Sequence, residues 1–159
     1  MQIIGILYPG DMGHSVGHVL REDGFSVVTS LLGRSERTRQ LSAQATITEL
    51  DSTLAVVERA DIILSIVPPT AARAVARDFS DAVREVNRKP LFIDANAISP
   101  MAVKDVGEIV TSAGCAFLDA CIIGPARDVR GRCTFYLSGR GTQQFEDGLG
   151  KSLRTHVLG

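Results

Sequence analysis

Residues 2–13 read QIIGILYPGDMG, and this stretch decides the fold. It opens with a short apolar run, rich in isoleucine and ending at Leu7, which predicts a buried β-strand. Two glycines follow within six residues, and residues 12–22 then place their apolar side chains at helical spacing. The stretch therefore predicts a strand, a tight turn and an amphipathic helix in direct succession.

The same alternation continues to the end of the chain. Short β-branched runs predict strands at residues 25–30, 46–48, 61–67, 91–94, 115–119, 134–137 and 155–158. Helical spacing predicts helices at residues 35–41, 51–59, 70–87 and 99–113 and a short helix after residue 142, with Ser35, Asp51, Thr70 and Ser99 as N-caps. Strands that alternate with helices are typical of βαβ units on a parallel sheet, so we predict an α/β class and one domain over residues 1–159.

Composition narrows the range of functions. A chain of 159 residues with 45% apolar and 22% charged residues can bury a core and falls outside the range of disordered proteins. Its net charge of −1 gives no reason to expect nucleic acid or an anionic membrane as a partner, which favours a small-molecule ligand. No apolar run approaches the ~20 residues of a membrane helix, so we expect a soluble, cytoplasmic protein. Three cysteines without a CxxC pair argue against a disulfide framework and a thiolate metal site.

The first turn carries the strongest functional signal. Tyr8-Pro9-Gly10-Asp11-Met12-Gly13 lies between strand and helix, where Rossmann-type dinucleotide-binding folds carry G-x-G-x-x-G. Gly10 stands where a missing side chain lets a pyrophosphate approach the backbone, and Gly13 where the helix packs closely on the strand. Tyr8 replaces the first glycine. We therefore predict a doubly wound, mostly parallel sheet with a dinucleotide site; an ordinary strand-to-helix turn is the alternative.

The end of the second strand predicts which dinucleotide is bound. NAD-binding domains carry an acidic residue there, whereas this chain has GRSERTR at residues 33–39. Arg34 can clamp a 2′-phosphate with charged hydrogen bonds, and Ser35 can add another while it caps the next helix. The predicted cofactor is NADP. For Arg37 and Arg39 a solvated basic helix face is the alternative to a phosphate contact.

Five segments together resemble a known family. They are GILYPGDMG (residues 5–13), GRS (33–35), ADIILSIVP (60–68), FIDANAISP (92–100) and FLDACIIG (117–124). In this order they are similar to the N-terminal half of the β-hydroxyacid dehydrogenases, which include 6-phosphogluconate dehydrogenase, 3-hydroxyisobutyrate dehydrogenase and imine reductases. The resemblance spans nearly the whole chain and does not indicate a substrate.

The resemblance implies a set of site residues. Asn96 would lie beside the nicotinamide ribose, although Ala97 stands where the family usually has threonine, and a helix-entry role for Asn96 ahead of Ser99 is the alternative. Gly124 alone matches the family's substrate segment, where Ile123 replaces a serine. The cofactor-binding set implied by the resemblance, with the phosphate contacts predicted above, is Gly10, Asp11, Met12, Gly13, Arg34, Ser35, Arg37, Val67, Pro68 and Asn96.

Three groups of side chains are not predicted to do chemistry. His14 and His18 are four residues apart on one helix but lack a third ligand, so we predict no metal site. Arg127, Arg130 and Arg132 follow the substrate segment, and a mobile, solvated loop is favoured over contact with an anionic substrate. The lysines at 89, 104 and 151 are interpreted as surface residues, which leaves the catalytic residue unidentified.

The resemblance also implies an activity. It implies an NADP-dependent oxidoreductase that transfers hydride between the nicotinamide and a small hydroxy acid, carbonyl or imine. In the family a helical domain follows and supplies the catalytic lysine and most of a dimer interface; we expect it to be absent from this chain after Gly159. We therefore expect a homo-oligomer or a separate helical catalytic domain as partner. The alternatives are a stand-alone module that binds or senses NADP without turnover, and a relic that binds no dinucleotide because of Tyr8.

Overall fold

The computed structural model describes residues 1–158 and arranges them around one mixed sheet. The elements in chain order are β1 (Ile3–Leu7), α1 (Asp11–Glu22), β2 (Ser26–Ser30), α2 (Glu36–Gln44), β3 (Thr48–Leu50), α3 (Thr53–Arg59), β4 (Ile62–Ser65), η1 (Pro69–Ala71), α4 (Ala72–Val86), β5 (Leu91–Asp94), α5 (Pro100–Ser112), β6 (Phe117–Ile123), η2 (Ala126–Asp128), α6 (Val129–Arg132), β7 (Thr134–Ser138), α7 (Thr142–Leu149) and β8 (Thr155–Val157).

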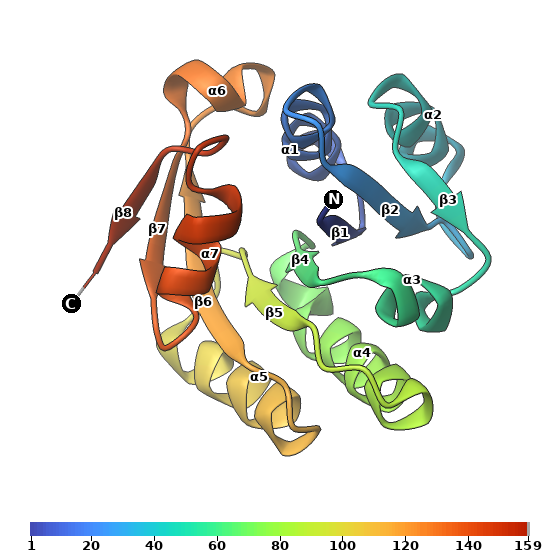
Figure 1. Ribbon diagram of the computed structural model, residues 1–159, viewed down its shortest axis with the longest axis vertical. Helices are drawn as coiled ribbons and strands as arrows, with labels where there is room; N and C mark the ends of the chain where they lie inside the picture. The colour runs from blue at the N-terminus through green and yellow to red at the C-terminus, as the bar shows by residue number, and fades with distance from the viewer. Residues whose placement is uncertain (159) are drawn as a thin grey trace.

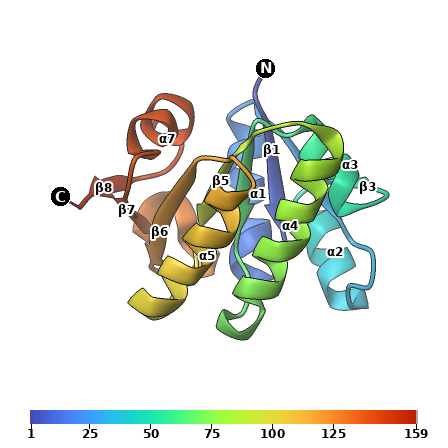
Figure 2. The same ribbon diagram turned by 90° about the horizontal axis from the view of Figure 1, so that it is seen from below.

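The sheet has the order β3-β2-β1-β4-β5-β6-β7-β8, and every neighbouring pair is parallel except β6 with β7. Helices α1, α2 and α6 lie on one side of the strands and α3, α4 and α5 on the other (Figure 1). Figure 2, seen from below, shows α4 and α5 side by side in front of the strands. This confirms the predicted doubly wound α/β fold, in which the order of strands reverses between β1 and β4.

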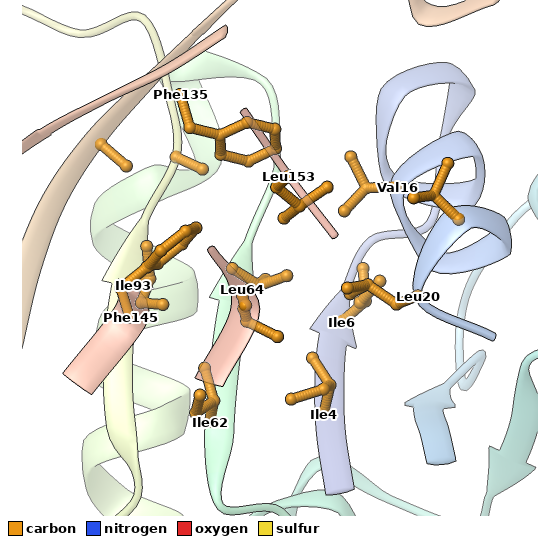
Figure 3. Close-up of a cluster of buried hydrophobic side chains, with 14 of the residues drawn as sticks. Ile4, Ile6, Val16, Leu20, Ile62, Leu64, Ile93, Phe135, Phe145 and Leu153 are labelled. Atoms are coloured by element: carbon orange, nitrogen blue, oxygen red, sulfur yellow. The ribbon is translucent and has the colours of Figure 1, made fainter. Parts of the chain in front are cut away.

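Two apolar cores hold the layers together, one on each face of the sheet. On the first face, Ile4 and Ile6 of β1 and Leu64 of β4 point toward α1 and α7 (Figure 3). The second face buries α3, α4 and α5 over the alternate side chains of the same strands. Gly5 of β1 faces this second core, where a Cβ would lie 2.6 Å from the end of Ile63. The missing side chain lets α3 pack directly on β1.

Several predicted boundaries are confirmed and others are wrong. Ser35 and Ser99 cap α2 and α5 as predicted, but Ser52 rather than Asp51 caps α3. Thr70 caps nothing, because a 3-10 turn over Pro69–Ala71 precedes α4.

The remaining errors have local causes. The strand expected at 46–48 begins two residues later, because α2 runs on to Gln44 and Thr46 turns the chain with a φ of 54°. The strand expected at 115–119 is β6 and continues to Ile123, because antiparallel pairing with β7 extends it.

Candidate functional site

A cavity opens where the order of strands reverses, at the carboxyl ends of β1 and β4. Ligands of doubly wound sheets bind at this edge, because the loops after the two central strands diverge there. The cavity has a volume of about 350 Å³ and takes its lining from the first turn, from α2 and from the segment after β4. The lining residues are Tyr8, Gly10, Asp11, Met12, Gly13, Thr38, Ile66, Val67 and Pro68.

The two glycines of the first turn are glycines for different reasons. A Cβ on Gly13 would lie 2.9 Å from the carbonyl oxygen of Tyr8, so the close approach of α1 to β1 excludes any side chain. A Cβ on Gly10 would meet no atom of residues 1–158 within 4 Å apart from its own chain neighbours, and the φ of Gly10 is −73°, which any residue adopts. Packing therefore requires Gly13 but not Gly10, whose open Cβ direction leaves room for a ligand over the α1 N-terminus.

Tyr8 accommodates the turn without the first glycine. Its backbone is left-handed, with a φ of 61°, and its carbonyl accepts a hydrogen bond from the Gly10 N–H at 2.7 Å. Its ring lies under the guanidinium of Arg34, with Cζ of Arg34 3.4 Å from the ring centroid. The replacement of the first glycine therefore changes the local backbone energy but not the course of the chain.

Arg34 and Ser35 lie at the start of α2. Gly33, with a φ of 72°, turns the chain out of β2, and the Arg34 N–H donates to the Leu31 carbonyl at 2.9 Å. Ser35 Oγ accepts from the Thr38 N–H at 3.2 Å and caps the helix. Within residues 1–158 the side chain of Arg34 makes no hydrogen bond to a protein acceptor. The positive end of α2 and one uncommitted guanidinium thus lie together.

Arg37 and Arg39 are held by the protein. Arg37 donates to Asp11 Oδ1 at 2.5 Å, which joins the first turns of α2 and α1 beside the cavity. Arg39 donates to Glu49 at 3.1 Å and to the Leu31 carbonyl at 2.8 Å, so it anchors α2 to β3. The exposed Arg37 pair is weak enough to be exchanged for a ligand phosphate, whereas Arg39 has a structural role.

Asn96 is 5% exposed and binds other protein groups. Its Oδ1 accepts from the Val67 N–H at 2.7 Å, and its Nδ2 donates to Asp94 Oδ1 and, at 3.4 Å, to Ser65 Oγ. These bonds join the ends of β4 and β5 and fix the backbone that leads into Pro68. Asn96 does not line the cavity itself, but it holds the backbone of Val67, which does.

Asp94 is the buried charge of this network. Burial raises its pKa to about 6, and the carboxylate of Asp119 on the neighbouring strand acts in the same direction, while hydrogen bonds from Asn96 oppose the shift. Its Oδ2 has no hydrogen-bond partner within residues 1–158. Burial also raises the pKa of Asp119. Neither carboxyl lines the cavity at β1 and β4.

The segment after β6 differs from the prediction. The solvated loop expected around Arg127, Arg130 and Arg132 is wrong, because residues 126–132 form η2 and α6. Arg130 donates to Asp23 at 3.0 Å and to Glu22 at 3.3 Å, so α6 is tied to α1. The hydrogen bond from Arg130 also lowers the pKa of Asp23.

Gly124 is a glycine for packing reasons. Its φ is 142°, and a Cβ there would overlap the Arg132 carbonyl and lie 2.7 Å from Cys133 Cα. Gly124 is not part of the cavity at β1 and β4, but Pro125 borders a second depression of about 450 Å³ with Asp11, His14 and Arg127.

No histidine or lysine of residues 1–158 lines the cavity at β1 and β4. His14 Nδ1 is hydrogen-bonded to the Gly10 carbonyl at 2.8 Å, and Nε2 of His18 lies 3.5 Å from Oε1 of Glu22. No three His, Cys, Asp or Glu side chains gather as a metal site among residues 1–158. Lys89 donates to the Ala113 carbonyl and Lys104 lies beside Glu108, so neither lysine lies in the cavity.

Among residues 1–158, no helix is both long and apolar enough to cross a bilayer.

Known proteins share this arrangement. Residues 3–147 match the family described as the NAD binding domain of 6-phosphogluconate dehydrogenase. The chain belongs to this family. Family membership confirms the resemblance found in the sequence, and it establishes an NAD(P)-binding domain of the oxidoreductase type.

Solved structures of other proteins have the same fold. A conserved protein of unknown function, described as similar to 3-hydroxyacid dehydrogenases, is 28% identical with a TM-score of 0.86, over 99% of this chain and 57% of that one. An imine reductase from Myxococcus stipitatus in complex with NADP+ is 18% identical with a TM-score of 0.82, over 99% of this chain and 55% of that one. The second likeness shows the fold alone.

A curated protein is also similar to most of this chain. An uncharacterized 28.5 kDa protein from Methanothermus fervidus is 26% identical over 121 residues, which are 76% of this chain and 45% of that protein. The present chain thus spans about half the length of the proteins that it matches.

Sequence reasoning missed three cavity residues and one contact. Tyr8, Thr38 and Ile66 line the cavity but were not among the predicted site residues. Thr38 could have been found, because it lies three residues after the Ser35 cap and so faces the α2 N-terminus. Ile66 is part of an apolar run and carries no such signal. The stacking of Arg34 on Tyr8 joins residues 26 positions apart, and only the folded chain reveals it.

Proposed function

We propose that this chain binds NADP(H) in preference to NAD(H), as the cofactor-binding half of an oxidoreductase that transfers hydride between the nicotinamide and a small hydroxy acid, carbonyl or imine. The observation that carries the preference is Arg34, which precedes the Ser35 cap of α2 and whose guanidinium lies over the Tyr8 ring without a protein acceptor in residues 1–158. An unpaired guanidinium matches the geometry of a phosphate, whereas NAD offers only ribose hydroxyls there.

The cavity fits a dinucleotide. Gly10 leaves open the space above the α1 N-terminus, where the backbone N–H groups of Asp11, Met12 and Gly13 would face the pyrophosphate. Arg34, Ser35 and Arg37 would hold the 2′-phosphate, with Arg37 released from Asp11. Val67 and Pro68, positioned by Asn96, would line the path toward the nicotinamide. When bound, the nicotinamide supplies or accepts the hydride; the chain binds it and orients it.

The substrate and partners of the whole protein are proposed by analogy with proteins of the same fold. A 3-hydroxyisobutyrate dehydrogenase from Mycobacterium tuberculosis, solved with L-serine, and imine reductases share the fold at 20% identity or less. We propose a small-molecule substrate near Asn96 and Gly124, and a homo-oligomer or a separate helical catalytic domain as the partner that completes the active site.

Calorimetric titration with NADPH and with NADH tests the cofactor preference. We expect NADPH to bind about ten- to a hundredfold more tightly, which corresponds to roughly 1.5 to 3 kcal/mol from charged hydrogen bonds to the 2′-phosphate. Arg34→Ala should abolish the difference. Arg59→Ala removes an exposed arginine from the last turn of α3, away from the cavity, and should leave it unchanged. Equal binding of both dinucleotides by the unmodified chain would refute the proposed preference.

A further inference from the structure

We propose that Tyr8 determines cofactor specificity as a positioning residue: its ring holds the Arg34 guanidinium in place with the N–H donors free for a phosphate. The inference rests on the proposed function, because it explains how Arg34 is prepared for the 2′-phosphate of NADP. It assigns a role to the residue that departs most from the dinucleotide-binding pattern, since Tyr8 stands in place of the first glycine.

The first observation is the geometry of the stack. Cζ of Arg34 lies 3.4 Å from the centroid of the Tyr8 ring, a distance at which the guanidinium rests on the ring face. All N–H donors of a guanidinium point outward in its plane, so stacking on one face leaves them free to bind oxygen atoms. A carboxylate partner would hold the arginine equally well but would occupy the same donors.

The second observation is the contrast with the two arginines that follow. Arg37 is bound to Asp11, and Arg39 is bound to Glu49 and to the Leu31 carbonyl. Arg34 alone among the three donates no side-chain hydrogen bond to a protein atom within residues 1–158. The ring of Tyr8 therefore does for Arg34 what carboxylates do for its neighbours, without neutralising its charge.

The third observation is the backbone of Tyr8. A φ of 61° is left-handed, and a side chain there costs stability that glycine would not. Strained residues of this kind persist where the side chain has a use. The Tyr8 ring packs against the core formed with α3 and α4, and Tyr8 also lines the cavity at β1 and β4. The core thus fixes the ring, and the ring borders both the cavity at β1 and β4 and the smaller pocket that Arg34 lines.

These observations predict a selective effect on affinity. A free arginine side chain must be ordered before it can clamp a phosphate, and the stack provides that order in advance. Loss of the ring should therefore weaken NADPH binding by roughly three- to thirtyfold and leave NADH binding within about twofold. A merely structural role for Tyr8 would weaken both dinucleotides alike.

The test titrates three variants with NADPH and NADH and, as smaller probes, with adenosine 2′,5′-bisphosphate and AMP. Tyr8→Leu removes the ring face, and Tyr8→Phe keeps it and should restore the preference. Tyr8→Gly removes the ring and suits the left-handed backbone, so it provides a folded variant without the stack even where Tyr8→Leu is unstable. We expect Tyr8→Leu and Tyr8→Gly to lose most of the preference for the 2′-phosphate.

Arg34→Ala in the same experiment separates the two proposals. If Arg34→Ala loses the preference while Tyr8→Leu and Tyr8→Gly keep it, the role of Tyr8 is refuted and the proposed function stands. If Tyr8→Leu and Tyr8→Gly weaken NADPH and NADH equally, Tyr8 is structural and the inference is also refuted. If Arg34→Ala keeps the preference, the role of Arg34 is refuted and the role assigned to Tyr8 fails with it. Equal binding of NADPH and NADH by the unmodified chain refutes the proposed function itself.

Discussion

The pair Gly10→Ala and Gly13→Ala separates ligand binding from folding at one turn. The added methyl group of Gly10→Ala meets no protein atom within 4 Å, so we expect the free energy of unfolding to change by less than about 1 kcal/mol, the balance of a poorer cap and a stiffer unfolded chain. The same methyl group occupies the space through which a pyrophosphate would reach the α1 N–H groups. Loss of one charged hydrogen bond there should weaken dinucleotide binding by roughly ten- to a hundredfold.

Gly13→Ala is the matched control. Its Cβ would lie 2.9 Å from a backbone oxygen that cannot move freely, so we expect a loss of about 1 to 3 kcal/mol, or roughly 2 to 12 °C in Tm. Thermal unfolding without ligand and titration with NADPH measure the two effects separately. Gly10→Ala protein that binds NADPH as tightly as the unmodified chain would show that the pyrophosphate does not approach Gly10, and the reasoning from the open Cβ direction would be wrong.

Three further predictions concern stability and assembly. Asn96→Ala should cost about 3 kcal/mol, seen as a fall in Tm, because it leaves the buried Val67 N–H without its acceptor and removes one of the two hydrogen bonds that residue 96 donates to Asp94; a loss below about 1 kcal/mol would contradict this. Folded Asp94 keeps its proton up to about pH 6 but releases it near 3.8 when unfolded, so stability falls as pH rises through this window. Asp94→Asn should therefore remove up to about 3 kcal/mol of that fall in urea titrations at pH 4 and pH 7, and an unchanged fall would show that the carboxyl titrates normally. Val157 and Leu158, 45% and 47% exposed at the β8 edge, should support self-association, which Val157→Lys should weaken in sedimentation experiments; a monomer at all concentrations would refute this.

The fold was predictable because its signals are local. The apolar run up to Leu7, the close packing at Gly13 and the caps Ser35 and Ser99 each act within a few residues, and each is confirmed. The errors lie where non-local contacts decide. Strand β6 is longer than predicted because β7 pairs with it, and α6, which Asp128 caps, is tied by Arg130 to Glu22 and Asp23, more than a hundred residues earlier.

The candidate site was predictable only in outline. The sequence indicates which segments meet at the end of a parallel sheet, because the carboxyl ends of the strands share one edge. It does not indicate how each polar group is used. Asn96 and Gly124 are both predicted ligand contacts, and that stays a prediction. The structure adds a packing reason for the residue type at each position. Asn96 belongs to a buried hydrogen-bond network, and Gly124 lies too close to Cys133 to carry a side chain.

Asn96 also shows how a buried amide can affect the site without facing it. Its Oδ1 holds the Val67 N–H, and its Nδ2 holds the Asp94 carboxylate, whose charge burial disfavours. Protonation of Asp94 would weaken the bond from Nδ2, because a neutral carboxyl is a poorer acceptor than a carboxylate. The position of Val67 at the cavity and the ionisation of Asp94 are therefore coupled through one side chain, so dinucleotide affinity should change with pH near 6 in the unmodified chain and less in Asp94→Asn.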